Sequence, residues 1–362
     1  MNFIHNLIMR NLHLTALWCG LSTLLLAPFL TFSQATTIPV ATTSTAISWF
    51  DQMMLEDSVG ALEIRLETDL KLLMRGKADE KYQAAVIKYK NKAGEEKTYN
   101  AEVKARGKTR KDICLHPPIK LKIKKVDLTA EGYSTHNEMK IVWECKPSGA
   151  FEQFIYKEYL AYRLYNLITP ASFRAKLVKI NLVDSKNPEK ITEKIGFIVE
   201  DEEQVEARLE TTMMEERPKD TKQFARAHFL NFVLYEYMIG NTDWAFGNSH
   251  NARFFEHNTT KKVIPVPYDF DYSGLVNAPY AVPHESIPIA NVRERYFKGG
   301  TVNQPEGMIL RKKFLESKTA VLDFIKNFSL LDKFNREDAL SYIEDFYKEL
   351  EDEKRFLRVI NP

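Results

Sequence analysis

The feature that most constrains this chain is a polar loop that directly follows a predicted buried helix. Residues 222–239 carry apolar side chains at helical spacing, and Gly240 is well placed to end that helix in a left-handed conformation. The loop that follows contains Asp243 and Asn248, five positions apart. A helix that ends in such a loop presents one carboxylate and one amide from a fixed support.

A second acidic segment follows about twenty residues later. Short apolar runs on either side of residues 257–260 predict a β-hairpin, and Asp269 and Asp271 come just after it. Asp, Asn and Gly are also ordinary turn residues, so any one of these positions alone favours a structural role. The order of loop, hairpin and second acid is harder to obtain from turns, and it predicts that these oxygen-bearing side chains meet at one site.

The N-terminus carries an export signal. Residues 1–34 contain Arg10, no acidic residue and a long apolar run, which is typical of a secretory signal peptide. An uncleaved N-terminal anchor is the alternative, and it would be the only membrane contact. Residues 35–54 follow as a linker, since the segment begins with many Thr, Ala and Ser residues. We therefore expect an exported protein that is periplasmic, surface-bound or extracellular.

Charge and cysteine content narrow the class of protein further. The formal net charge is +2 and falls to +1 when Arg10 is removed with the signal, so no global field favours nucleic acid. Cys114 and Cys145 remain after the signal segment. They form either a disulfide, as an oxidising compartment permits, or two buried thiols, and the sequence leaves both open.

The pattern of apolar residues predicts a division into two parts. Ile119–Ile123 alternates throughout, and similar runs at 62–66, 85–89, 97–103 and 139–143 predict further strands. Helical patterns dominate after residue 200. We expect an α+β fold with an antiparallel-sheet-rich part at 55–200 and a helical part at 201–362.

Basic residues are concentrated in the sheet-rich part. Residues 104–125 hold nine lysines or arginines against the single acid Asp112. Most of these predict a solvated strand face. The cations at Arg106, Lys120 and Lys122 also suit phosphate binding beside a backbone turn. No aromatic residues are interleaved with them, which argues against nucleic acid.

These motifs together resemble the CotH-type kinases, first known from spore coats, and their more distant HipA-like relatives. The resemblance covers most of residues 60–345 and is most specific at 240–271. It implies a two-lobed protein-kinase-like fold, with the sheet-rich part as N-lobe and the helical part as C-lobe. It also implies an exported kinase that uses ATP with Mg²⁺ or Mn²⁺ and phosphorylates Ser or Thr of exported or surface proteins.

The resemblance assigns roles to individual residues. Asp243 would orient or deprotonate the acceptor hydroxyl, while Asn248 and Asp269 would hold the metal, with Asp271 as a second carboxylate. Contacts to the nucleotide would come from the remaining residues, namely Arg106, Lys120, Lys122, Glu158 and Glu200. Of these, Lys120 or Lys122 would reach the phosphates and pair with Glu158 or Glu152, and Glu200 would face adenine.

The sequence supports an alternative function of a different class. A non-catalytic exported binding or surface-assembly protein could keep the same fold without the reaction. No Gly-x-Gly-x-x-Gly loop covers the phosphates, and Trp244 follows Asp243 where a basic residue often stands in relatives. The presence of Asp243, Asn248 and Asp269 together favours the enzyme. Metal-dependent phosphoester hydrolysis is a third option, for which only Asp269 and Asp271 offer paired carboxylates.

Overall fold

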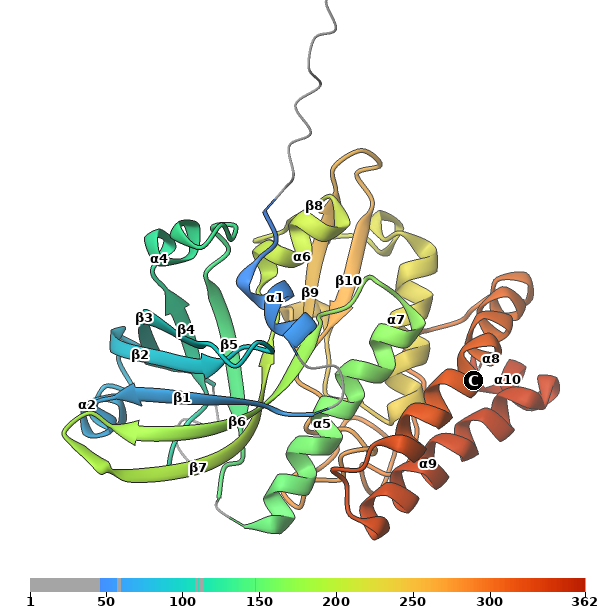
Figure 1. Cartoon of the computed structure of the whole chain (residues 1–362). Coiled ribbons are helices and arrows are strands. Elements are labelled where there is room, and N and C mark those ends of the chain that lie inside the picture. The colour runs from blue at the N-terminus through green and yellow to red at the C-terminus, as the bar shows by residue number, and fades with distance from the viewer. Residues whose placement is uncertain (1–45, 57–59, 108–109, 111–113, 147, 362) are drawn as a thin grey trace, which may run out of the picture. The chain divides into compact units, whose positions relative to one another are not determined.

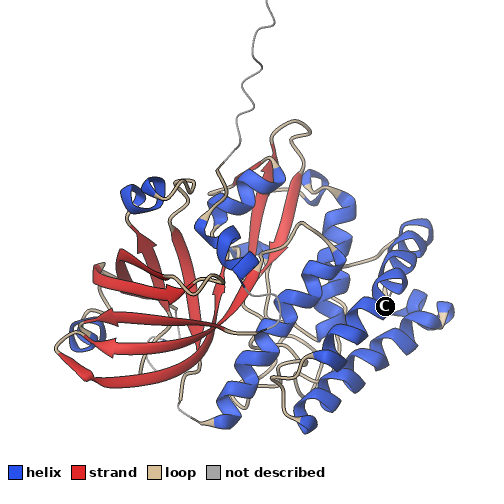
Figure 2. Cartoon of the chain, in the orientation of Figure 1, coloured by secondary structure: helices blue, strands red, loops and turns tan. Residues whose placement is uncertain are grey.

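Seven strands from the first half of the chain close into a β-barrel (Figures 1 and 2). The computed structural model describes residues 46–56, 60–107, 110, 114–146 and 148–361. The barrel strands are β1 (Leu62–Thr68), β2 (Gln83–Lys90), β3 (Glu96–Ala105), β4 (Ile119–Ile123), β5 (Glu138–Trp143), β6 (Ala175–Asp184) and β7 (Asn187–Val199). The predicted signal peptide lies outside the described residues, as does the first part of the predicted linker.

The barrel corrects the expected fold class. Around the barrel the order is β1-β2-β3-β4-β5-β7-β6, and β1 closes it by pairing in parallel with β6, from Leu62 opposite Val178 to Thr68 opposite Asp184. A two-lobed protein-kinase-like fold with an antiparallel sheet is therefore wrong for this chain. Alternation in a strand shows which side chains face the core, but it does not show which strand pairs with which edge, so closure was not predictable.

The barrel interior is filled by apolar side chains from every strand. Alternate residues such as Ile64, Ile87 and Leu121 are fully buried. Helix α1 (Trp49–Glu56), at the end of the segment predicted as a linker, adds Trp49 and Phe50 to this core. The ring of Trp49 meets the rings of Tyr89 and Tyr99 edge-on, with centroids 5.8 and 5.6 Å apart.

Most of the remaining elements pack around a second core, whereas α2 (Leu70–Arg75) and α4 (Lys125–Ala130) add Leu70, Leu73 and Leu128 to the barrel core. A three-stranded sheet has the order β10-β9-β8, and antiparallel β9 and β10 form the predicted hairpin. These strands are β8 (Thr211–Met213), β9 (Ala252–His257) and β10 (Val263–Pro267). The other helices are α5 (Gly149–Ile168), α6 (Glu202–Leu209), α7 (Arg226–Ile239), α8 (Gln304–Asn327), α9 (Lys333–Glu351) and α10 (Glu353–Val359), with short 3₁₀ turns η1 (Thr221–Gln223) and η2 (Phe246–Asn248). Across the described ranges, no helix combines the length and apolarity that a membrane crossing requires.

Helix α7 ends where the sequence predicts. Gly240 adopts φ 66° and its backbone N–H donates to the carbonyls of Glu236 and Tyr237. A Cβ at this position would lie 2.0 Å from Oη of Tyr342, so glycine is required by the backbone angle and by the space. The loop that carries Asp243 therefore begins at a fixed point on a buried helix.

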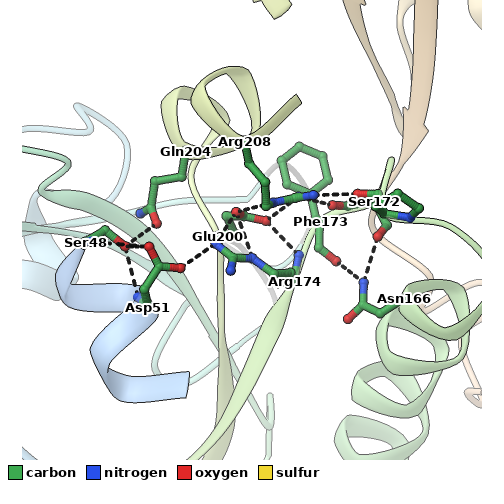
Figure 3. Close-up of polar contacts among 10 residues, drawn as sticks. Ser48, Asp51, Asn166, Ser172, Phe173, Arg174, Glu200, Gln204 and Arg208 are labelled. Carbon is green, nitrogen blue, oxygen red and sulfur yellow. Dashed lines mark hydrogen bonds and ion pairs between the residues drawn. The ribbon is translucent and has the colours of Figure 1, made fainter. Parts of the chain in front are cut away.

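A junction between the barrel and the helices is held by buried charge. Glu200, directly after β7, is fully buried and accepts hydrogen bonds from Arg174 at 2.6 and 3.0 Å and from Arg208 at 3.0 and 3.2 Å (Figure 3). Arg174 also pairs with Asp51 of α1 at 2.8 Å. A buried carboxylate with two guanidinium partners is fully compensated, so this network fixes the barrel end to α1 and α6.

The two cysteines form a disulfide, which decides between the two alternatives. Their Cα atoms lie 4.6 Å apart, within the range a disulfide permits, and the bridge spans 31 positions of sequence. Cys145 directly follows Glu144, whose buried carboxylate lies 3.1 Å from Nζ of Lys194. The bridge therefore ties the chain between β3 and β4 to the end of β5.

We predict that removing the disulfide destabilises the protein without changing its fold. A double Cys114→Ser, Cys145→Ser variant should lose about 3–4 kcal/mol of unfolding free energy, because the denatured chain is no longer cross-linked. Urea unfolding with and without reductant measures this. The double variant, which reductant cannot affect, is the control, and equal midpoints for the oxidised and reduced wild type would contradict the prediction.

Candidate functional site

The loop after α7 places Asp243 in contact with a histidine and an asparagine. His250 Nε2 lies 3.1 Å from Asp243 Oδ1, and Asn251 Nδ2 donates to Asp243 Oδ2 at 3.0 Å and to its backbone carbonyl at 2.7 Å. Burial raises the pKa of Asp243 above its ordinary value, and His250 partly offsets this. The carboxylate is thus oriented from both sides while remaining partly exposed.

The structure places Asn248 and Asn251 differently. Asn248 is exposed at the end of η2, where its Oδ1 accepts from the backbone N–H of His250 at 3.2 Å. Asn251 is buried, adopts φ 52° and directly precedes β9. Both follow Asp243, and the spacing that suggested Asn248 contains no information on burial. Asn251, which the sequence reasoning missed, is the asparagine that binds the Asp243 carboxylate, while Asn241 accepts a hydrogen bond from the Asp243 backbone N–H.

Asp269 follows β10 in a left-handed conformation with φ 64°. Its backbone N–H donates to Oη of Tyr162, a buried residue of α5, at 2.9 Å. Burial and the neighbouring Asp271 raise the pKa of Asp269, whereas Arg110 and Arg106 oppose that rise; Asp243 also raises it. Asp243 and Asp271 therefore both act electrostatically on Asp269.

A single arginine links the barrel to this acidic group. Arg110 Nη2 lies 2.9 Å from Glu158 Oε2 and 2.8 Å from Asp271 Oδ2. Both carboxylates are buried, and Tyr280 Oη also donates to Asp271 at 3.1 Å. The expected pairing of Glu158 with Lys120 or Lys122 is therefore wrong, because its partner is Arg110.

The two predicted lysines lie on the outer face of the barrel, whereas Arg106 lies near the acidic group. Lys120 and Lys122 both pair with Glu138 of β5, Lys122 at 3.6 Å. Arg106 follows β3 and lies close enough to lower the pKa of Asp269. Neither lysine has a described contact with the acidic group, whereas Arg106 is electrostatically part of it.

Glu200 is committed to the structural junction described above. Its carboxylate is fully buried and receives hydrogen bonds from two arginines (Figure 3). Such a carboxylate already has its hydrogen-bonding capacity taken by protein donors. The prediction that Glu200 faces a nucleotide base stays a prediction, and the geometry gives Glu200 a clear role in holding β7 against α6.

Acidic side chains outnumber basic ones at the site, where Glu158, Asp243, Asp269 and Asp271 lie with Arg106 and Arg110. Burial raises the pKa of Glu158 to about 8; Arg110 opposes this, and Asp271 and Asp269 add to it. Burial also raises the pKa of Asp269. Excess carboxylate of this kind is compensated when a divalent cation binds, since oxygen ligands suit Mg²⁺ and Mn²⁺.

The acidic group is not a preformed metal cage. In the described part of the chain, no three His, Cys, Asp or Glu side chains are arranged to hold one metal ion. Mg²⁺ sites in phosphate-using proteins commonly take one or two carboxylates and complete their coordination with water and substrate phosphate. Asp269 and Asp271 offer carboxylates of the kind that such a site uses, and Asn251 offers an amide beside Asp243.

A buried acid lies beneath the Asp243 loop. Glu236 of α7 is 1% exposed, and within the described ranges neither of its carboxyl oxygens has a hydrogen-bond partner. Burial raises the pKa of Glu236 well above its ordinary value, and the nearby Asn241 and Lys298 offset only part of this effect. Glu236 therefore favours its protonated form in the folded state.

This raised pKa predicts a pH-dependent stability. In the unfolded chain Glu236 ionises near pH 4.5, whereas in the folded protein it holds its proton to higher pH. Its contribution is therefore complete below about pH 4.5 and is lost as pH rises towards the folded-state pKa. Glu236→Gln should gain stability relative to wild type as pH increases from 5 to 8.

Chemical denaturation across this pH range provides the measurement. Glu316→Gln, at an exposed position of α8, is the matched control and should show no such trend. A constant stability difference between Glu236→Gln and wild type at all pH values would contradict the prediction.

Comparison with known proteins gives limited similarity. No family model matches the chain, and the search of curated proteins found no match. Among solved structures, the chain is similar to the proinflammatory kinase CtkA of Helicobacter pylori, with 10% identity and a TM-score of 0.40. The matched region covers 71% of this chain and 94% of that chain. At this level of similarity, the site has to be judged from its own geometry.

Proposed function

We propose that this protein is an exported, metal-dependent phosphotransferase that moves the terminal phosphoryl group of ATP to a Ser or Thr hydroxyl of an exported or surface protein. The observation that carries the proposal is that Arg110 pairs with Asp271 and Glu158, while Asp243 lies within electrostatic reach of Asp269. Asp243 stands beside Asn251, while Asp269 and Asp271 lie next to Arg110 and Glu158.

Each group has a task in this reaction. The acceptor oxygen attacks the terminal phosphorus of ATP, and the bond between that phosphorus and the oxygen of the departing ADP breaks. Asp243 takes the proton of the acceptor hydroxyl. Asn251 and Asp269, with Asp271, would hold Mg²⁺ or Mn²⁺, which neutralises charge on the phosphates. Arg110 and Arg106 supply positive charge from the barrel side. Asn248 is the alternative amide ligand from the same loop.

Export and family membership belong to the same proposal. The disulfide between Cys114 and Cys145 supports an oxidising compartment, in agreement with the signal sequence at 1–34. The loop at 241–248 and the acid at 269 support a relationship to the CotH-type kinases, although the barrel departs from the fold expected of them. A non-catalytic binding protein is the alternative that the experiments below distinguish.

Two acidic variants should separate binding from transfer. Asp269→Ala should abolish metal-dependent ATP binding, because it removes a carboxylate that joins metal to phosphate. Asp243→Asn keeps an oxygen for Asn251 and should bind ATP as wild type does. It should nevertheless lose roughly 10²–10⁴-fold in phosphoryl transfer, since the proton acceptor is gone.

Calorimetry with ATP and Mn²⁺, together with transfer of labelled phosphate to protein, gives both readouts. Wild type that binds ATP but transfers no phosphate would favour the binding protein. If both variants bind ATP as wild type does, Asp269 is not a ligand and the proposal fails.

The two asparagines offer a matched pair. Asn251→Ala should weaken Mn²⁺-dependent ATP binding by roughly 10-fold or more, because a buried ligand and a hydrogen bond to Asp243 are lost together. Asn248→Ala removes a similar side chain from an exposed position of the same loop and should leave binding within about 2-fold of wild type. The same titrations measure both, and the opposite ranking would return the ligand role to Asn248.

A further inference from the structure

An irregular segment between Asp271 and α8 reaches the backbone on both sides of Asp243. Lys298 Nζ donates to the carbonyl oxygen of Thr242 at 2.8 Å and to that of Trp244. The same ammonium lies 4.5 Å from the centroid of the Trp244 ring. One side chain therefore holds the residue before and the residue after Asp243.

The segment that carries Lys298 is itself firmly anchored. Arg293 donates to the carbonyl of Gly274 at 2.9 Å and to Asp338 Oδ1 at 2.8 Å. Arg295 donates to the carbonyl of Met238 at 3.1 Å and also to that of Tyr342. Both guanidinium groups lie over the Tyr342 ring, at 4.2 and 3.9 Å from its centroid. Lys298 thus extends from a support fixed to α7 and α9.

Two hydrogen bonds that flank one residue restrict its direction. The Thr242 carbonyl belongs to the peptide plane directly before Asp243, and the Trp244 carbonyl belongs to the plane between Trp244 and Ala245. Holding both carbonyls restricts the backbone before and after Asp243 and so the direction of its Cα–Cβ bond. His250 and Asn251 hold the carboxylate, and Asn251 also binds the carbonyl of Asp243 itself, whereas Lys298 binds the carbonyls of the residues before and after Asp243. Hydrogen bonds from a charged donor are stronger than those between neutral groups, so the two bonds from Lys298 favour one conformation of the loop.

We propose that Lys298 is a positioning residue that fixes the Asp243 loop for proton transfer. This rests on the proposed function, because it gives Lys298 a role in the same reaction. Lys298 acts through the backbone, so it contributes to the chemical step and leaves ATP binding unchanged. Glu236 and Asp243 are the acidic groups whose charge acts on Lys298.

The test compares Lys298→Met with Lys298→Arg. Lys298→Met should lower kcat roughly 10–100-fold, the range expected when a misplaced group loses its geometry, with KM for ATP within about 2-fold. Lys298→Arg keeps a charged donor and should recover part of this loss. Lys313→Met is the control. It removes a different lysine, which is half-buried in α8, and should retain full kcat.

A double-variant cycle separates positioning from general stability. If Lys298 acts through Asp243, Lys298→Met should reduce kcat much less in an Asp243→Asn background than in wild type, while its effect on thermal unfolding stays the same. Equal loss of kcat in both backgrounds, or unchanged kcat in folded Lys298→Met, would overturn the proposal.

Hydrogen exchange gives a readout that does not depend on catalysis. Amides of residues 241–251 should exchange faster in Lys298→Met than in wild type, and Lys298→Arg should restore protection. If wild type transfers no phosphate, the proposed function fails, and exchange still decides whether Lys298 holds this loop. Unchanged exchange in Lys298→Met would remove the structural basis of the inference.

Discussion

The interaction on which the site depends is the sharing of Arg110 between Glu158 and Asp271. The three residues come from the chain between β3 and β4, from α5, and from the segment after β10. Removing the guanidinium would leave two buried carboxylates without a close cation, which costs several kcal/mol in buried pairs. The shared arginine thus fixes the barrel against the acidic segment, with a geometry that apolar packing alone would not specify.

The disulfide and the Glu200 network support that arrangement from two sides. The backbone N–H of Cys114 donates to the carbonyl of Arg110 at 3.1 Å. Because Cys114 is bonded to Cys145, the disulfide also restrains the backbone of Arg110. At the other end of the barrel, Glu200 binds Arg174 and Arg208 and so fixes β7 to α6. These contacts make the relative placement of barrel and helices a consequence of charge compensation as well as apolar burial.

The Asp243 loop is organised in a different way, by hydrogen bonds to its backbone. Gly240 sets the start of the loop, Asn251 binds the carbonyl of Asp243, and Lys298 binds the carbonyls on either side. Only one of these residues lies in the motif that the sequence singled out. The loop that carries this partly exposed carboxylate is therefore held both by nearby residues and by Lys298, which is remote in sequence.

Local order was determined by the sequence itself. The alternation of apolar residues predicted both ends of β4 correctly, and helical spacing with a terminal glycine predicted the end of α7. Both patterns depend on periods of a few residues. The chain order of Asp243, hairpin and Asp269 likewise follows from the sequence, as does the presence of two cysteines able to pair. Partner choice was decided only by the tertiary structure. Parallel pairing of β1 with β6 closed the barrel, Arg110 in place of Lys120 or Lys122 met Glu158, and Asn251 in place of Asn248 met Asp243. For the two side-chain contacts, other residues of similar chemistry were available nearby in the sequence. Only long-range packing fixed which side chain, and which strand, met which neighbour.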